Sequence, residues 1–212
     1  MKKIVLIGDS IRMGYDKYVR QSLEETAEVY YPDENCKFAQ YILRMVGGWK
    51  SKWPEDIDLV HWNAGLWDVI ELYGDGPLTP IEYYAQMIKR VDKRLRMFYP
   101  NAKIVFATST AVIESGNSSN HSRSNATIEA YNQAAIEALK DTDTIINDLY
   151  ALTKDAPEEW HSDRTHYKTP KAIQAIGGQV VDVICKELDI SSKEIDMTTF
   201  DPTRYSKENI GF

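Results

Sequence analysis

Cysteine is scarce in this sequence, since Cys36 and Cys185 are the only two among 212 residues. They do not form a Cys-x-x-Cys pair, and neither stands at a spacing with histidine that is typical of a zinc site. Two cysteines could form one disulfide, but we expect two reduced thiols. The sequence therefore predicts no disulfide framework, and we expect no metal and no other cofactor.

Long apolar runs are also absent. A membrane-spanning helix needs roughly 20 apolar residues, and no stretch of the chain approaches that length. At the N-terminus, MKKIVLIGDS, the apolar run covers only residues 4–7, whereas a signal peptide has about 7–15 apolar residues. We therefore expect no membrane span, a buried first strand rather than a signal peptide at residues 4–7, and a cytoplasmic location unless a leader has been removed.

Basic residues are fewer than acidic ones, with 25 Lys and Arg against 32 Asp and Glu, and the formal net charge is −7. An acidic surface repels phosphate backbones, so a nucleic acid is not an expected partner. Apolar residues make up 43% and charged residues 27%, which is ordinary for a globular protein. Nothing in the composition indicates an oligomeric state.

Apolar runs and helical periodicity divide the chain into alternating elements. The predicted strands cover residues 4–7, 28–31, 58–63, 103–107 and 144–147. The predicted helices cover residues 15–27, 36–46, 79–98, 125–139 and 170–188. Gly47 and Gly48 are expected to end the second helix, and Thr79 with Pro80 to begin the third. A Ser-, Asn- and Gly-rich surface loop is expected at residues 114–124.

This alternation predicts an α/β fold: a three-layer α/β/α sandwich around a five-stranded parallel sheet with a flavodoxin-like strand order. We expect a single domain over residues 1–190 and a C-terminal tail over residues 191–212 without clear periodicity. In such a fold, active sites lie at the carboxyl ends of the strands. Polar clusters at those positions are therefore the candidates for a functional site.

Three polar clusters occupy such positions. Residues 8–10 (Gly-Asp-Ser) follow the first strand, residues 63–68 (Asn-Ala-Gly-Leu-Trp-Asp) follow the third, and residues 163–166 (Asp-Arg-Thr-His) precede the last helix. A serine nucleophile needs a base, and the base needs an orienting partner. Ser10, His166 and Asp163 can fill these roles. The backbone N–H of Ser10 and the amide of Asn63 can stabilise the oxyanion.

Each cluster alone also has an ordinary structural explanation. Gly-Asp-Ser can be a turn followed by a helix N-cap. Asp163 can be a capping residue beside a surface histidine, and Asn63 can satisfy backbone groups of its own loop. The catalytic hypothesis depends on the three clusters occurring together, in this order, at the predicted strand ends.

Two of these segments resemble blocks of the SGNH (GDSL-like) hydrolase family. IVLIGDSIRMGY is similar to the first block, with Ser10 at the nucleophile and Ile11 where a leucine often stands. SDRTHY is similar to the last block, whose Asp-x-x-His pair supplies the acid and the base. The resemblance spans about residues 3 to 188. It implies a flavodoxin-like sandwich, catalytic roles for Asp163 and His166, and ester hydrolysis without a metal.

The two middle blocks depart from the family pattern. The third block is usually Gly-x-Asn-Asp, and residues 65–68 read Gly-Leu-Trp-Asp, so that Trp67 replaces the asparagine. We expect Asn63, two residues before the glycine, to reach the oxyanion instead. The second block usually offers a glycine N–H, but residues 31–36 contain no glycine. We assign that donor to the Cys36 backbone, because Gly47 and Gly48 lie beyond the second helix and better suit a helix cap.

Aromatic and basic residues near the clusters are candidates for substrate contacts. Trp62, Trp67 and Tyr167 are expected to line the substrate pocket, although tryptophans also simply pack in cores. Arg12 and Arg164 could bind a carboxylate, but we expect solvated arginines at both positions.

The leading hypothesis is a serine hydrolase that cleaves a small O-acyl ester through an acyl-enzyme on Ser10. The family resemblance favours an O-acetylated carbohydrate, with an acyl thioester or a lysophospholipid as alternatives. A second hypothesis is a catalytically inactive binding module on the same fold, because the middle blocks are altered. A third is a metal-dependent phosphoesterase with Asp9, Asp163 and His166 as ligands, but it has too few candidate ligands.

Overall fold

A five-stranded parallel sheet forms the centre of the protein. The computed structural model describes residues 1–115, 117–118 and 120–201. The strands follow the order β2-β1-β3-β4-β5, and every neighbouring pair is parallel. They are β1 (Lys2–Ile7), β2 (Ala27–Tyr30), β3 (Leu59–Trp62), β4 (Lys103–Ala107) and β5 (Ile145–Asn147). The predicted flavodoxin-like order is confirmed.

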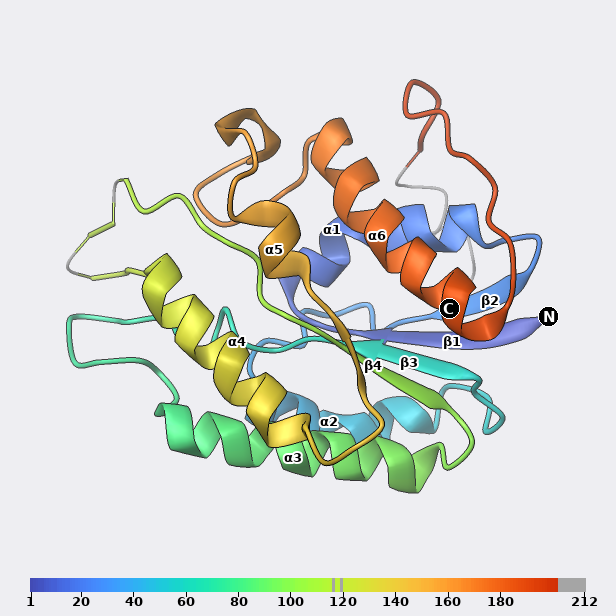
Figure 1. Cartoon of the computed structure of the whole chain (residues 1–212), viewed down its shortest axis with the longest axis horizontal. Coiled ribbons are helices and arrows are strands. Elements are labelled where there is room, and N and C mark those ends of the chain that lie inside the picture. The colour runs from blue at the N-terminus through green and yellow to red at the C-terminus, as the bar shows by residue number, and fades with distance from the viewer. Residues whose placement is uncertain (116, 119, 202–212) are drawn as a thin grey trace.

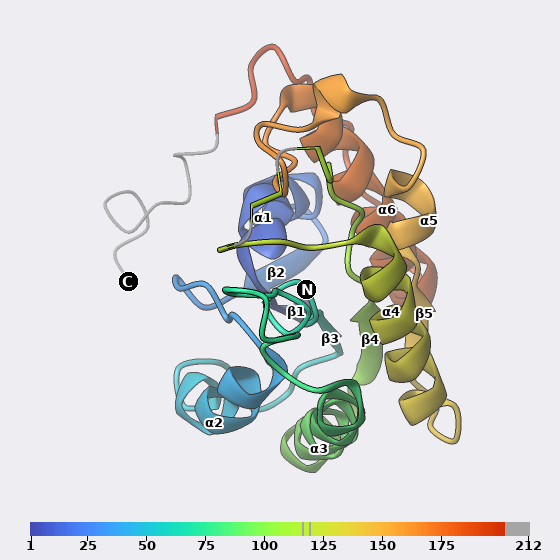
Figure 2. The same ribbon diagram turned by 90° about the vertical axis from the view of Figure 1, so that its left-hand side faces the viewer.

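Helices cover both faces of this sheet. They are α1 (Ser10–Ser22), α2 (Ala39–Lys50), α3 (Ile81–Phe98), α4 (Asn125–Leu139), α5 (Leu149–Thr153) and α6 (Pro170–Leu188), with a 3₁₀ turn, η1, at Glu158–Trp160. Figures 1 and 2 show α1 and α6 on one face, and α2 and α3 on the other, where α4 packs beside α3. The predicted three-layer α/β/α sandwich is therefore confirmed.

The central strands are buried on both faces, as a parallel sheet between helices requires. The aliphatic side chains of residues 4–7 in β1 have no exposed surface. In β3 and β4, the rings of Trp62 and Phe106 pack edge to face with centroids 4.8 Å apart. This core fixes the carboxyl ends of β1, β3 and β4 next to one another, at the edge of the sheet that Figure 2 faces.

The first two helices begin and end at residues other than those predicted. The helix expected at residues 15–27 spans Ser10–Ser22, because the Asp9 side chain caps it directly after β1. The helix expected at residues 36–46 spans Ala39–Lys50, so the prediction that Gly47 and Gly48 end it is wrong. Its apolar face continues past both glycines to Trp49, which is buried.

Smaller differences concern the later elements. Pro80 is the N-cap of α3 and Ile81 its first residue, so this helix begins one position later than Thr79 and Pro80 indicated. The short α5, which Asp148 caps, and η1 were not predicted. The expected loop at residues 114–124 includes positions 116 and 119, which lie outside the described residues.

The described part of the C-terminal tail packs against α1. The Lys193 N–H donates to the Ser22 carbonyl at 2.8 Å, and Ile195 is buried. The ring of Phe200 contacts Tyr18, with centroids 6.1 Å apart. The rest of the predicted tail, residues 202–212, lies outside the described residues.

Both cysteines are free thiols, as predicted. Within residues 1–201, apart from the gaps at 116 and 119, no helix has the length and apolar character needed to cross a membrane.

Candidate active site

The turn between β1 and α1 presents Ser10. Strand β1 ends at Ile7, and Ser10 is the first residue of α1. The Asp9 carboxylate accepts the Ile11 N–H at 2.9 Å and so caps the helix. A side chain at position 8 would collide with Asn63 Oδ1, which is why a glycine stands there. This tight turn places Ser10 at the carboxyl edge of the sheet, with its hydroxyl in a pocket.

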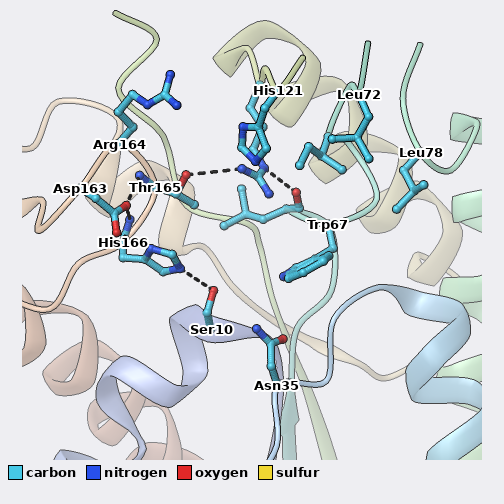
Figure 3. A pocket seen from close by; sticks show the side chains of 13 residues that line it. Ser10, Asn35, Trp67, Leu72, Leu78, His121, Asp163, Arg164, Thr165 and His166 are labelled. Carbon is cyan, nitrogen blue, oxygen red and sulfur yellow. Dashed lines mark hydrogen bonds and ion pairs between the residues drawn. The ribbon is translucent and has the colours of Figure 1, made fainter. Parts of the chain in front are cut away.

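Ser10 is hydrogen-bonded to the predicted base. His166 Nε2 lies 2.8 Å from Ser10 Oγ, and His166 Nδ1 lies 2.7 Å from Asp163 Oδ2 (Figure 3). This is the geometry in which a serine hydroxyl loses its proton to an oriented imidazole. The structure therefore brings together the three residues that the first and last blocks predicted for the triad.

Asp163 is held in its ionised form. Its Oδ1 accepts the backbone N–H groups of Thr165 at 2.8 Å and His166 at 2.9 Å. Partial burial opposes ionisation, but these two bonds and the bond to the imidazole outweigh it and lower the pKa of Asp163 to about 2. The carboxylate therefore stays charged at any ordinary working pH, which favours the tautomer of His166 with its proton on Nδ1.

The prediction for Cys36 is wrong. Its N–H donates to the Gly8 carbonyl at 3.1 Å and is not free to bind an oxyanion. The preceding residue, Asn35, lines the pocket with Ser10. Asn35 Oδ1 accepts the Lys37 N–H at 2.8 Å, and Figure 3 shows the amide nitrogen on the side of Ser10. Sequence reasoning missed Asn35, although it stands in the segment aligned with the second block.

Asn63 also lies elsewhere than predicted. It is buried, with 4% of its surface exposed, and it is not among the residues that line the pocket. Its side chain lies against the Gly8 turn, close to the buried carboxylate of Asp9, whose pKa it lowers against the effect of burial. Asn63 therefore packs against the turn that carries Ser10 and does not line the pocket into which the Ser10 hydroxyl points.

Only one of the three aromatic residues proposed for substrate contact lines the pocket. Trp67 does so. Trp62 has no exposed surface and packs on Phe106 in the core. Tyr167 is also buried. Its hydroxyl donates to the Ala111 carbonyl at 2.9 Å, and its ring lies against His161. The predictions for Trp62 and Tyr167 are therefore corrected.

The two arginines near the clusters, Arg12 and Arg164, differ in their exposure to solvent. Arg12 is not solvated as expected, because it is buried and forms an ion pair with Asp16 at 2.5 Å. Arg164 lines the pocket beside His166.

The pocket has a cavity volume of about 610 Å³ and two unlike walls. One wall is apolar and consists of Leu66, Trp67, Ile70, Leu72 and Leu78. The other is polar and consists of His121, Arg123, Asp163, Arg164, Thr165 and His166, with Ser10 and Asn35 at its base. A small substrate with an apolar part and a polar part fits such a site.

No cluster of three or more His, Cys, Asp or Glu side chains in the described ranges could hold a metal ion. Asp9 in particular is fully buried and caps α1, so it does not join Asp163 and His166. The arrangement gives the metal-dependent phosphoesterase hypothesis no ligand set.

A second buried carboxylate, Asp68, lies behind the site. Asp68 Oδ2 accepts the Ala39 N–H at 3.2 Å, whereas Oδ1 has no partner in the described structure. Burial raises the pKa of Asp68 to about 7. The nearby Thr79 side chain and the Ala39 N–H oppose this rise only partly, and the nearby Asp9 adds to it. The folded protein therefore holds a proton on Asp68 at pH values where the unfolded chain does not.

This raised pKa predicts a stability that depends on pH. The contribution of Asp68 is fully present below its unfolded value of 3.8 and is lost as the pH rises through about 7. We expect Asp68→Asn to reduce the fall in unfolding free energy between about pH 4.5 and about pH 8. Urea unfolding at both pH values, followed by tryptophan fluorescence, measures this, with the exposed Asp155→Asn as control. An unchanged pH dependence in Asp68→Asn contradicts the assignment.

No family model matches the sequence, and no curated protein matches it. Solved structures do match the fold. The lipase/acylhydrolase from Enterococcus faecalis has 18% identity and a TM-score of 0.71, over 92% of this chain and 100% of that one. An acetylxylan esterase from Geobacillus stearothermophilus has 15% identity and a TM-score of 0.65, over 90% and 95%.

A carbohydrate esterase of family 3 from Talaromyces cellulolyticus is similar to the same extent, with 18% identity and a TM-score of 0.64, over 90% of this chain and 100% of that one. These likenesses span nearly the whole length of each protein. The chain therefore has the fold of these acylhydrolases and esterases, which confirms the fold that the sequence resemblance implied.

Proposed function

We propose that this protein is a serine esterase of the SGNH type, which hydrolyses a small O-acyl ester through an acyl-enzyme on Ser10. The observation that carries the proposal is the continuous hydrogen-bonded relay from Asp163 through His166 to Ser10, with distances of 2.7 and 2.8 Å. This relay opens into a pocket at the carboxyl edge of an acylhydrolase-like fold.

The relay performs the reaction in two halves. His166 Nε2 takes the Ser10 hydroxyl proton as Oγ attacks the carbonyl carbon of the ester, and then gives that proton to the departing alcohol. Water attacks the resulting acyl-enzyme, and His166 accepts its proton. The acid leaves as Ser10 regains a proton. Asp163 orients the imidazole and stabilises its charged form throughout.

The negative oxygen formed in each half needs fixed donors. The first is the Ser10 N–H, at the N-terminus of α1, where the helix dipole also favours negative charge. The second is the side-chain amide of Asn35. The third is the indole N–H of Trp67, which has no hydrogen-bond partner in the described ranges and stands where the usual family pattern has an asparagine. Figure 3 shows Asn35 and Trp67 on the same side of Ser10.

The substrate class is proposed as an O-acetylated carbohydrate. Two of the similar structures are named acetylxylan esterase and carbohydrate esterase, and the fold alone connects them to this chain. An acyl thioester or a lysophospholipid stays the alternative, because the apolar wall with Leu72 and Leu78 can hold an acyl chain. Acetate release from acetylated xylo-oligosaccharides, compared with hydrolysis of an acyl thioester, distinguishes the two.

The experiment that tests the proposed activity is hydrolysis of p-nitrophenyl acetate in the presence of a metal chelator. We expect turnover well above the background rate and unchanged by the chelator, because the relay consists of protein side chains alone. Hydrolysis no faster than background contradicts the proposal and favours the inactive binding module. Turnover that the chelator abolishes favours the metal-dependent alternative.

A further inference from the structure

Arg123 is a buried cation in the wall of the candidate active site. Only 9% of its surface is exposed, and it lines the same pocket as Ser10 and His166. Its Nε donates to the Leu66 carbonyl at 2.6 Å, and its Nη1 lies 3.4 Å from Thr165 Oγ1. These contacts hold the guanidinium between the loop that follows β3 and the loop that carries His166.

The charge of Arg123 has no counter-ion in residues 1–201, as far as these are described, since it forms no ion pair with an aspartate or glutamate there. The carboxylates of Asp9 and Asp163 attract it only at longer range, and neither forms an ion pair with it. Asp9 caps α1, and Asp163 holds His166. A buried charge without a partner is costly, so its retention calls for an explanation.

Bracing of the two loops explains only part of this arrangement. The bonds to Leu66 and Thr165 use Nε and Nη1, and a neutral donor could make both of them. The second terminal nitrogen, Nη2, has no hydrogen-bond partner in the described structure. Burial lowers the pKa of Arg123, yet a guanidinium stays charged at any working pH.

The pocket around Arg123 is basic, although the whole chain carries a net charge of −7. Arg164 lines the same polar wall and repels Arg123. The only carboxylate that lines this pocket in the described structure is Asp163, which is bound to His166. An anionic ligand group would supply the missing counter-charge in the pocket.

We infer that the substrate of this esterase carries a carboxylate, which Arg123 binds and thereby positions the ester above Ser10. The inference rests on the proposed function and narrows its substrate class. A guanidinium matches the planar carboxylate and presents paired N–H donors to it. The carboxylate can belong to the acyl part, as in a dicarboxylic half-ester, or to the alcohol part, as in an acetylated uronic acid.

Calorimetric binding to the Ser10→Ala variant tests the inference without any turnover. Two matched pairs of probes distinguish the two sources of the charge. Monomethyl and dimethyl succinate compare a charged with a neutral acyl part, and methyl glucuronide and methyl glucoside compare a charged with a neutral sugar. We expect the charged member of at least one pair to bind about 10- to 100-fold more tightly, as charge-assisted hydrogen bonds allow.

Variants at Arg123 in the same Ser10→Ala background assign this preference. Arg123→Gln is expected to abolish it, and Arg123→Lys to keep a reduced part of it, because lysine retains the charge without the paired donors. The control is Arg90→Gln, which removes an exposed arginine from α3 outside the pocket and should leave the preference intact.

Equal binding of the charged and neutral members in both pairs by Ser10→Ala would overturn the inference. This test does not need Arg123→Gln, so it holds even if that variant fails to fold. A preference that survives in Arg123→Gln, or that Arg90→Gln removes equally, overturns it as well. Binding is measured without Ser10, so these outcomes are separate from a failure of the esterase assay, which concerns the proposed function alone.

Discussion

Ser10→Ala is expected to lower kcat for p-nitrophenyl acetate by up to about 10⁶-fold, as loss of the nucleophile does in other serine hydrolases. The reason is the 2.8 Å contact between Ser10 Oγ and His166 Nε2, which links the attacking oxygen to its base. Without Oγ no acyl-enzyme can form, and only weak catalysis by the remaining donors is left. Steady-state kinetics at saturating ester measures the loss.

The matched control for this prediction is Ser191→Ala. Ser191 is exposed and lies in the tail beyond α6, away from the pocket. Its replacement should leave kcat and KM unchanged. If Ser10→Ala keeps most of the wild-type kcat while circular dichroism shows a folded protein, the nucleophile is another residue.

Trp67→Phe is expected to lower kcat by about 10²–10³-fold, which is the effect of removing one oxyanion donor. Phenylalanine keeps an aromatic ring on the apolar wall but lacks the indole N–H. Because the donor acts on charge that develops only in the transition state, KM should change little. Asn35→Ala is expected to have an effect of similar size, since it removes the other side-chain donor.

Trp53→Phe is the control for Trp67→Phe. Trp53 is half-buried and lines a different hollow, with Tyr30 and Tyr31. The Trp53→Phe variant should have the kcat and KM of the wild type. A value of kcat near wild type for Trp67→Phe, or a loss that appears only in KM, shows that the indole serves to hold substrate and that the oxyanion is stabilised elsewhere.

The sheet and the contacts among Ser10, His166 and Asp163 were predictable because their signals are local. An aliphatic run such as residues 4–7 has few alternatives to a strand buried on both faces of a parallel sheet. Once the strands are assigned, chain topology brings their carboxyl ends to one edge, which places Ser10 near the start of the last helix. The separation of three residues between Asp163 and His166 lets both side chains share one turn, as the 2.7 Å contact shows.

That the Cys36 N–H is not available to an oxyanion was not predictable, because a long-range contact occupies it. The N–H of Cys36 donates to the carbonyl of Gly8, which lies far from it in the sequence. The backbone then turns at Lys37 with a positive φ of 52°, and the Asn35 side chain supports this turn. Neither feature leaves a signal in the local sequence, so a backbone donor at Cys36 was the simpler expectation.

Burial of single side chains explains the remaining differences. Trp49 is buried, and this extends α2 through two glycines that would otherwise favour a helix end. Trp62 lies in the core because β3 is buried on both faces, so that its side chains are buried on whichever face they point to. Arg123 belongs to a segment of polar composition that indicated only a surface loop, and nothing in that composition shows that one side chain turns inward to the pocket.

The central claim, a covalent intermediate on Ser10, is tested most directly by labelling with a fluorophosphonate, which reacts only with an activated serine. Trypsin releases the segment IVLIGDSIR, residues 4–12, in which Ser10 is the only serine. Mass spectrometry is expected to find one label per chain, on this peptide, together with loss of ester hydrolysis. No label should appear in a His166→Ala variant. Label on a different peptide, or continued hydrolysis by a chain labelled at Ser10, would contradict the proposed mechanism.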